Sequence, residues 1–209
     1  MAPADVLLMY FGSSLLLALA PGPDNLFVLT QAVHKGRMAG LAVTGGLCTG
    51  LLVHTSAVTF GVAAIFQTSL LAFSILKYVG AVYLLYLAWL SFRASSGGAG
   101  NGQQQENLSY GRLYRRGIFM NITNPKVSLF FLAFLPQFTS QSYGAIVPQM
   151  LTLGALFIVA TILVFGGLSL VAGSVGEKLR GSSRAQTILN RLAGSIFAAL
   201  AIKLALTER

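Results

Sequence analysis

The sequence predicts an all-α integral membrane protein with six transmembrane helices in two inverted three-helix repeats, helices 1 and 4 being broken at proline motifs. Hydrophobic residues make up 55% of the 209 residues, charged residues only 9%, and the mean hydropathy is +0.74. A water-soluble domain of this size carries more polar surface than that. Apolar stretches that reach the roughly 20 residues needed to cross a bilayer occur six times. They cover residues 5–33, 40–66, 69–92, 115–138, 146–172 and 187–206.

Basic residues predict how these helices are oriented. Ten of the fourteen lysines and arginines lie in or beside the first, third and fifth loops: Lys35, Arg37, Arg93, Arg112, Arg115, Arg116, Lys178, Arg180, Arg184 and Arg191. The positive-inside rule places those loops in the cytoplasm and both termini outside. The formal charge of +9 therefore does not indicate a nucleic-acid partner, because the basic residues flank helix ends and form no single basic face.

The third loop divides the chain into two similar halves. Residues 94–105 are rich in Gly, Ser and Gln and have nothing to bury, so we expect a flexible segment. We assign residues 1–92 to the first three-helix repeat, 93–114 to a cytoplasmic loop, and 115–209 to the second repeat of one membrane domain. An odd number of spans in each half makes the second half enter from the opposite side of the bilayer, which is typical of transporters.

Two short motifs mirror each other in helices 1 and 4. Residues 20–25 read Ala-Pro-Gly-Pro-Asp-Asn, residues 121–126 read Asn-Ile-Thr-Asn-Pro-Lys, and each places a charge directly after a proline within an apolar run. Proline lacks the N–H that a helix interior needs, so both helices are expected to break here. At about 1.5 Å per residue from the cytoplasmic loops, both motifs lie roughly 15 Å deep, near the middle of the bilayer.

Charge at that depth favours a binding site. Pro23 and Pro125 suit the first position of a half-helix, with Gly22 and Asn124 as N-caps. Unpaired N–H groups at the start of each half-helix, together with Lys126, are suited to a carboxylate. Asp24 is suited to an amino group or a proton, with His54 as the second proton candidate. We predict that substrate contacts Gly22, Pro23, Asp24, Asn25, Asn121, Asn124, Pro125 and Lys126.

Simpler interpretations of the same residues remain open. Single prolines in membrane helices are more often kinks than sites. Asp24 and Lys126 can also form a structural ion pair that locks two helices, and His54 a hydrogen bond between helices. A cation or metal exporter would use Asp24 and His54 as ligands, although this is a poor divalent site by ligand number and charge.

Chemistry beyond transport has little support in the sequence. No nucleophile–base pair, paired carboxylates or metal-ligand cluster is visible, so neither an enzyme nor a membrane-embedded assembly factor is favoured. The single cysteine, Cys48, excludes an internal disulfide and a CxxC redox pair. We expect no cofactor and no metal. The expected partners are an amino-acid substrate, protons and the lipid bilayer, and a homo-oligomer stays open.

The chain resembles the LysE/RhtB type of amino-acid exporters over nearly its whole length. The resemblance is carried by Ala20-Pro21-Gly22-Pro23; by Gly36, Gly40, Gly46, Gly50, His54 and Gly61; by Lys77-Tyr78-Val79-Gly80-Ala81 and Tyr83-Leu84; by Gly117, Asn121 and Asn124-Pro125-Lys126; and by Phe130-Phe131 and Leu135-Pro136-Gln137-Phe138. The Asn-Pro-Lys and Pro-Gln-Phe blocks after a Pro-Gly-Pro helix are its most specific part. It implies a secondary transporter in the bacterial inner membrane that exports a small amino acid or derivative, driven by proton exchange.

Overall fold

The computed structural model describes residues 2–20, 22–68, 70–93, 108–172 and 183–206, and these residues form helices and no strands. The first half contains α1 (Ala4–Leu19), α2 (Pro23–Lys35), α3 (Arg37–Thr68) and α4 (Leu70–Arg93). The second half contains α5 (Tyr110–Ile122), α6 (Pro125–Leu129), α7 (Ile146–Thr161) and α9 (Ser183–Leu206). Between these lie two π-helical turns, η1 (Phe130–Phe134) and η4 (Ile162–Gly166), and two 3₁₀ turns, η2 (Leu135–Phe138) and η3 (Gln141–Tyr143).

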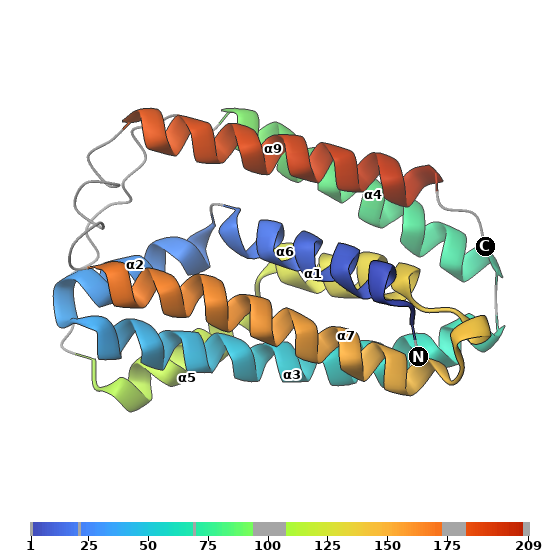
Figure 1. Cartoon of the computed structure of the whole chain (residues 1–209), viewed down its shortest axis with the longest axis horizontal. Helices are drawn as coiled ribbons and strands as arrows, with labels where there is room; N and C mark the ends of the chain where they lie inside the picture. The colour runs from blue at the N-terminus through green and yellow to red at the C-terminus, as the bar shows by residue number, and fades with distance from the viewer. Residues whose placement is uncertain (1, 21, 69, 94–107, 173–182, 207–209) are drawn as a thin grey trace.

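The helices run lengthwise in one elongated bundle (Figure 1). When the bent pairs α1–α2 and α5–α6 are each taken as one unit, successive units run in opposite directions. The start of α1 and the end of α9 lie at the same end of this bundle. The turn between α2 and α3, at Gly36, lies at the opposite end together with the end of α4. The start of α3 and the end of α4 therefore lie at the end of the bundle opposite to the start of α1 and the end of α9.

Both predicted helix breaks are present. α1 ends at Leu19 and α2 begins at Pro23, and their axes differ by 64°. α5 ends at Ile122 and a new helix begins at Pro125, with a bend of 49°. Each proline stands in the first turn of the new helix, where its missing N–H costs no hydrogen bond.

Length and hydropathy identify fewer membrane spans than the six predicted. Within the described residues, Arg37–Gly61 and Ile146–Ala172 are each long and apolar enough to cross a membrane. Each of the two bent pairs also passes this test when it is taken as one span, which gives up to four. The chain is thus a helical protein with several apolar helices, and the six-helix inverted repeat remains a proposal.

One expected boundary differs. The apolar stretch was expected from residue 115, after a loop at 93–114, whereas α5 already begins at Tyr110. The polar stretch after Tyr110 hides this helix from a hydropathy reading, but Leu113 is fully buried and packs in a cluster with Val43 and Leu47 of α3. The flexible tract expected at residues 94–105 lies outside the described residues.

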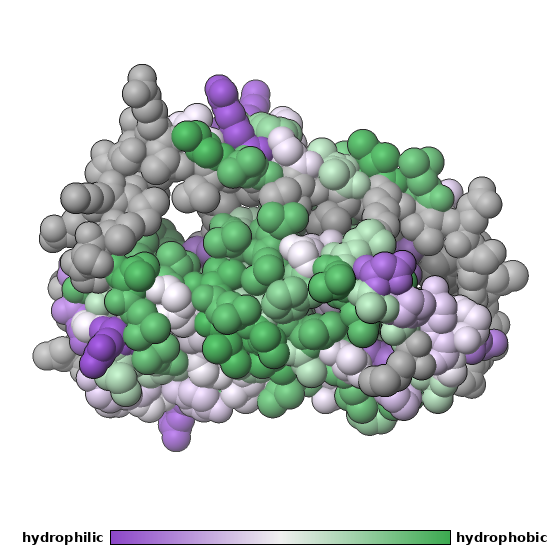
Figure 2. All heavy atoms as spheres, in the orientation of Figure 1, coloured by the Kyte–Doolittle hydropathy of each residue, from purple (hydrophilic) through white to green (hydrophobic). Residues whose placement is uncertain are grey.

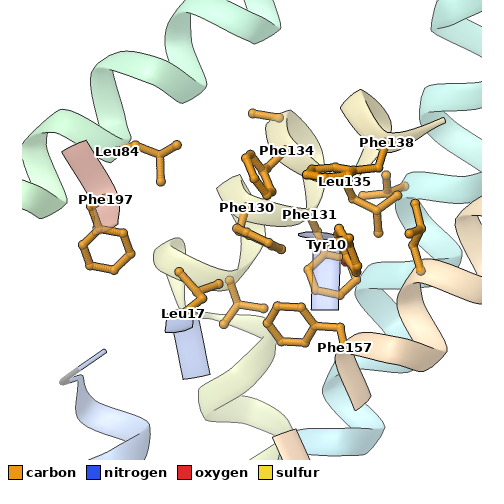
Figure 3. Close-up of a cluster of buried hydrophobic side chains, with 14 of the residues drawn as sticks. Tyr10, Leu17, Leu84, Phe130, Phe131, Phe134, Leu135, Phe138, Phe157 and Phe197 are labelled. Carbon is orange, nitrogen blue, oxygen red and sulfur yellow. The ribbon is translucent and has the colours of Figure 1, made fainter. Parts of the chain in front are cut away.

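The core lies where the broken helices meet the rest of the bundle. α3 packs on α2, α5 and α7, α1 packs on α7, and α4 pairs with α9. Figure 3 shows the larger hydrophobic cluster, which is rich in aromatic side chains from η1 and η2. Tyr10 of α1 stacks edge-on against Phe138 with ring centroids 5.2 Å apart, and Phe157 of α7 contacts Phe130 at 5.3 Å. This cluster holds the segment after the second break in place.

Large apolar side chains also cover the outside of the bundle. In Figure 2 hydrophobic residues fill the middle of the visible face, and hydrophilic ones gather toward its margins. Leu8, Phe60 and Val82 are each at least two-thirds exposed. A surface of this kind suits lipid rather than water.

Candidate functional site at the two helix breaks

The two helix breaks meet inside the bundle and bring both predicted charges into one buried site. Asp24 follows the first break and is 3% exposed, and Lys126 follows the second and is 8% exposed. They lie close enough for their charges to interact. Their hydrogen bonds, however, go to different partners.

Asn124 connects the breaks. Its Nδ2 donates to Asp24 Oδ2 at 2.7 Å, which links α6 to α2. Its Oδ1 accepts from the backbone N–H of Lys126 at 3.0 Å, which is the N-cap predicted from the sequence. One buried amide therefore starts the second half-helix and holds the carboxylate of the first.

The start of α6 does not have the free N–H groups that we expected to bind a carboxylate. The N–H groups of Val127 and Ser128 both donate to the backbone oxygen of Asn124, at 3.1 and 3.0 Å. With Lys126 N–H bound to Asn124 Oδ1, and no N–H on Pro125, the first turn of α6 is fully used. The reason is local: an asparagine N-cap followed by proline satisfies the turn by itself.

The start of α2 is different because glycine has no side chain. Gly22 occupies the N-cap position with an extended backbone, φ −169°, and makes no side-chain cap. A Cβ at this position would lie 3.1 Å from Lys126 Nζ and 3.8 Å from Asn25 Oδ1. Gly22 therefore leaves room for the lysine, and α2 is the half-helix whose first turn lacks a side-chain cap.

Lys126 binds the carboxyl end of α1. Its Nζ donates to Ala20 O at 3.1 Å and to Leu17 O at 3.4 Å. The last carbonyls of a helix have no partner within the helix and carry the negative end of its dipole, so a buried ammonium is stabilised there. The sequence analysis did not identify these two backbone oxygens as part of the site, because a carbonyl has no sequence signal of its own. The predicted helix break is the one feature that could have indicated them.

Asn25 completes this end of α1, since its Nδ2 donates to Ala18 O at 2.8 Å. Three buried acceptor oxygens nevertheless remain without a hydrogen-bond partner: Asp24 Oδ1, Asn25 Oδ1 and Asn121 Oδ1. Buried polar atoms in native proteins normally have partners. Acceptors without donors match a ligand that supplies N–H groups.

His54 lies next to this site and bonds to a different residue from the one that Asp24 bonds to. Its Nε2 bonds to the backbone oxygen of Asn121 at 3.1 Å, and because a carbonyl only accepts, Nε2 carries the hydrogen. Asn124 N–H donates to the same oxygen at 3.1 Å. His54 and Asp24 are thus connected through the Asn121–Asn124 turn. Gly50 makes this contact possible, because a Cβ there would lie 2.6 Å from the Asn121 side chain.

A metal site is not evident in the described part of the chain. No group of three His, Cys, Asp or Glu residues comes together there. Asp24 and His54, the ligands that a cation exporter would need, make separate hydrogen bonds to Asn124 and Asn121.

Comparison with known proteins places this site in a family. The profile of the LysE type translocators matches residues 15–208, which include both breaks and all the site residues. The chain belongs to this family. The resemblance seen in the sequence is therefore confirmed, and the family is one of translocators.

Relatives of this LysE type translocator include named efflux proteins. The chain is 36% identical over 188 residues to a homoserine/homoserine lactone efflux protein of Salmonella typhimurium, and 35% identical to one of Salmonella typhi; each match covers 90% of both proteins. It is 31% identical to an uncharacterized membrane protein of Vibrio cholerae, over 92% of both. No solved structure matches the chain.

Proposed function

We propose that this protein is a secondary transporter that exports a small amino acid or amino-acid derivative across the bacterial inner membrane by proton antiport. The observation that carries the proposal is the buried site at the two breaks, where Asp24 keeps one oxygen without a partner. Two relatives named for homoserine and homoserine lactone efflux support this substrate class.

The proposed substrate lies between the breaks with its amino group toward Asp24 Oδ1. Its carboxyl or lactone oxygens face the start of α2, which has no side-chain cap, and the ammonium of Lys126. The asparagines supply neutral hydrogen bonds. The full proposed contact set is Gly22, Pro23, Asp24, Asn25, Asn121, Asn124, Pro125 and Lys126.

The proposed architecture is an inverted repeat of three helices in each half. Packing supports it: α3 of the first half packs on α5 of the second, and α7 of the second half packs on α1 of the first. The third helices, α4 and α9, pair with each other. Each contact of the first half with the second thus has a counterpart of the second half with the first. This is the pattern expected for two halves related by a two-fold axis in the membrane plane.

For proton coupling we propose Asp24 first and His54 second. A carboxylate that binds either a proton or the substrate amine links the two movements, because the two compete for the same oxygens. Export is then driven by the proton gradient across the membrane.

The test is transport in vesicles that contain the purified full-length protein. Radiolabelled homoserine is expected to enter vesicles with an acidic lumen faster than vesicles without a gradient, and a protonophore should remove the difference. Protein-free vesicles control for passive entry. Uptake that requires the protein but ignores the gradient would contradict proton antiport. Gradient-driven flux of divalent cations instead of homoserine would favour the cation exporter.

A further inference from the structure

The position of Lys126 Nζ is itself that of a bound ammonium ligand. It lies at the carboxyl end of the sixteen-residue helix α1, 3.1 Å from Ala20 O and 3.4 Å from Leu17 O. Lys126 comes from α6 in the other half of the chain, so no local sequence rule places it there. An ammonium has three N–H donors, and these two carbonyls use two of them.

The surroundings contain more acceptors than Lys126 uses. Asn25 Oδ1 is buried without a partner and flanks the same face of Gly22 as Lys126 Nζ, the two atoms being 3.8 and 3.1 Å from the Cβ that Gly22 lacks. Asp24 Oδ1 is also buried and free, on a residue whose charge interacts with Lys126. The acceptors at this end of α1 are therefore suited to one compact cation.

We propose that the carboxyl end of α1, with Asp24 and Asn25, is an ammonium-binding site that Lys126 occupies in this state, and that the amino group of the transported molecule displaces it. The proposal rests on the proposed function and adds that the substrate amino group takes the place of Lys126 at the last carbonyls of α1. The displaced Lys126, on its flexible four-carbon stem, then turns to the carboxyl or lactone oxygens of the same molecule.

Exchange of one cation for another has a physical advantage. A buried carboxylate and a helix carboxyl end without a cation are costly, because both have lost their water. With Lys126 in place, the transporter without substrate keeps a cation near the buried Asp24 carboxylate and avoids this free-energy cost. The substrate must then carry an ammonium, whereas a carboxylate is not required.

Chemical rescue tests the site without transport. Lys126→Ala removes the atoms of a propylammonium ion, so n-propylammonium should bind the vacant site and raise the melting temperature of the full-length variant in detergent, by about 5 °C at a hundredfold excess over its Kd. The wild-type protein should respond much less, because Lys126 must first be displaced, and so should Lys35→Ala, which removes an ammonium at the other end of α2. n-Propanol, which has no charge, should stabilise none of the three. An equal response of Lys126→Ala and wild type to n-propylammonium would overturn the inference.

Homoserine lactone connects the site to the substrate. It carries an ammonium without a carboxylate, and it should stabilise Lys126→Ala in competition with n-propylammonium, whereas N-acetyl-homoserine lactone should not. Rescue by n-propylammonium without any effect of homoserine lactone would support the ammonium site and overturn homoserine lactone as the substrate.

A second variant covers the case in which Lys126→Ala does not fold. Gly22→Ala narrows the same site, because its Cβ would lie 3.1 Å from Lys126 Nζ. Homoserine lactone should then stabilise Gly22→Ala less than wild type. Equal stabilisation would overturn the inference.

Discussion

Asn124 Nδ2 donates a 2.7 Å hydrogen bond to Asp24 Oδ2, and this bond joins the two broken helices of the two halves. The same side chain caps α6 through its Oδ1. The Asn124 amide therefore connects both halves of the chain, and a change at one break alters the hydrogen bonding at the other.

Asn124→Ser and Asn124→Ala separate the two roles of this amide. Serine keeps an N-cap oxygen, so the alanine variant should be less stable than the serine variant by about 1 kcal/mol. Both lose the bond to Asp24, so both should lose most export. Unfolding in detergent and export from vesicles measure the two effects. Full export by Asn124→Ser would show that the bond to Asp24 is dispensable.

Asp24→Asn should abolish export driven by a pH gradient while the protein remains folded and inserted. The asparagine oxygen still accepts from Asn124 Nδ2, so the link between the halves is kept and only the ionisable group is lost. The informative control is the double variant Asp24→Asn with Lys126→Gln, which carries no charge at the site. It should remain inactive. Recovery of transport in the double variant would indicate that the two residues are only a structural pair.

His54→Gln should keep gradient-driven export to within about twofold, because the glutamine amide can donate to Asn121 O as Nε2 does. His54→Leu should lower export and stability, since it removes the donor. The ratio of export with and without the gradient is the measurement. A His54→Gln protein that moves substrate downhill but ignores the gradient would identify His54, rather than Asp24, as the coupling residue.

Gly46→Ala should destabilise the protein by about 1–3 kcal/mol, the usual cost of overpacking. A Cβ at Gly46 would collide with the backbone of α5, at Tyr114 O and 3.0 Å from Gly117 Cα, and backbone atoms cannot turn aside. Gly61→Ala on the same helix is the matched control, because nothing lies within 4 Å of its Cβ position. It should be neutral or stabilising by up to about 1 kcal/mol. Equal stability of the two variants would contradict the close packing of α3 on α5.

Cysteine labelling tests the orientation. In a Cys48→Ser background, Ser142→Cys in the exposed turn η3 should react with an impermeant maleimide in intact cells. Arg37→Cys, exposed at the start of α3, should react only after the membrane is opened. This result is expected because Arg37 lies in a basic loop, which the positive-inside rule places in the cytoplasm, whereas Ser142 lies in a loop on the opposite side. The opposite labelling pattern would reverse the topology.

The sequence by itself determined the class of the protein, the two helix breaks, the N-cap at Asn124 and the family. These depend on neighbours along the chain: apolar runs, a proline that cannot continue a helix, and an asparagine that caps the next turn. They are local rules, so they can be read before the chain folds.

Only the tertiary structure decided which groups the two charges bind. Lys126 reaches the carbonyls of Leu17 and Ala20, and Asp24 reaches Asn124, across about half the length of the chain. Backbone carbonyls are the same at every residue, so composition and spacing cannot mark them. Which of them lose their helical partners, and which cation is near enough to replace those partners, depends on how the two halves pack together.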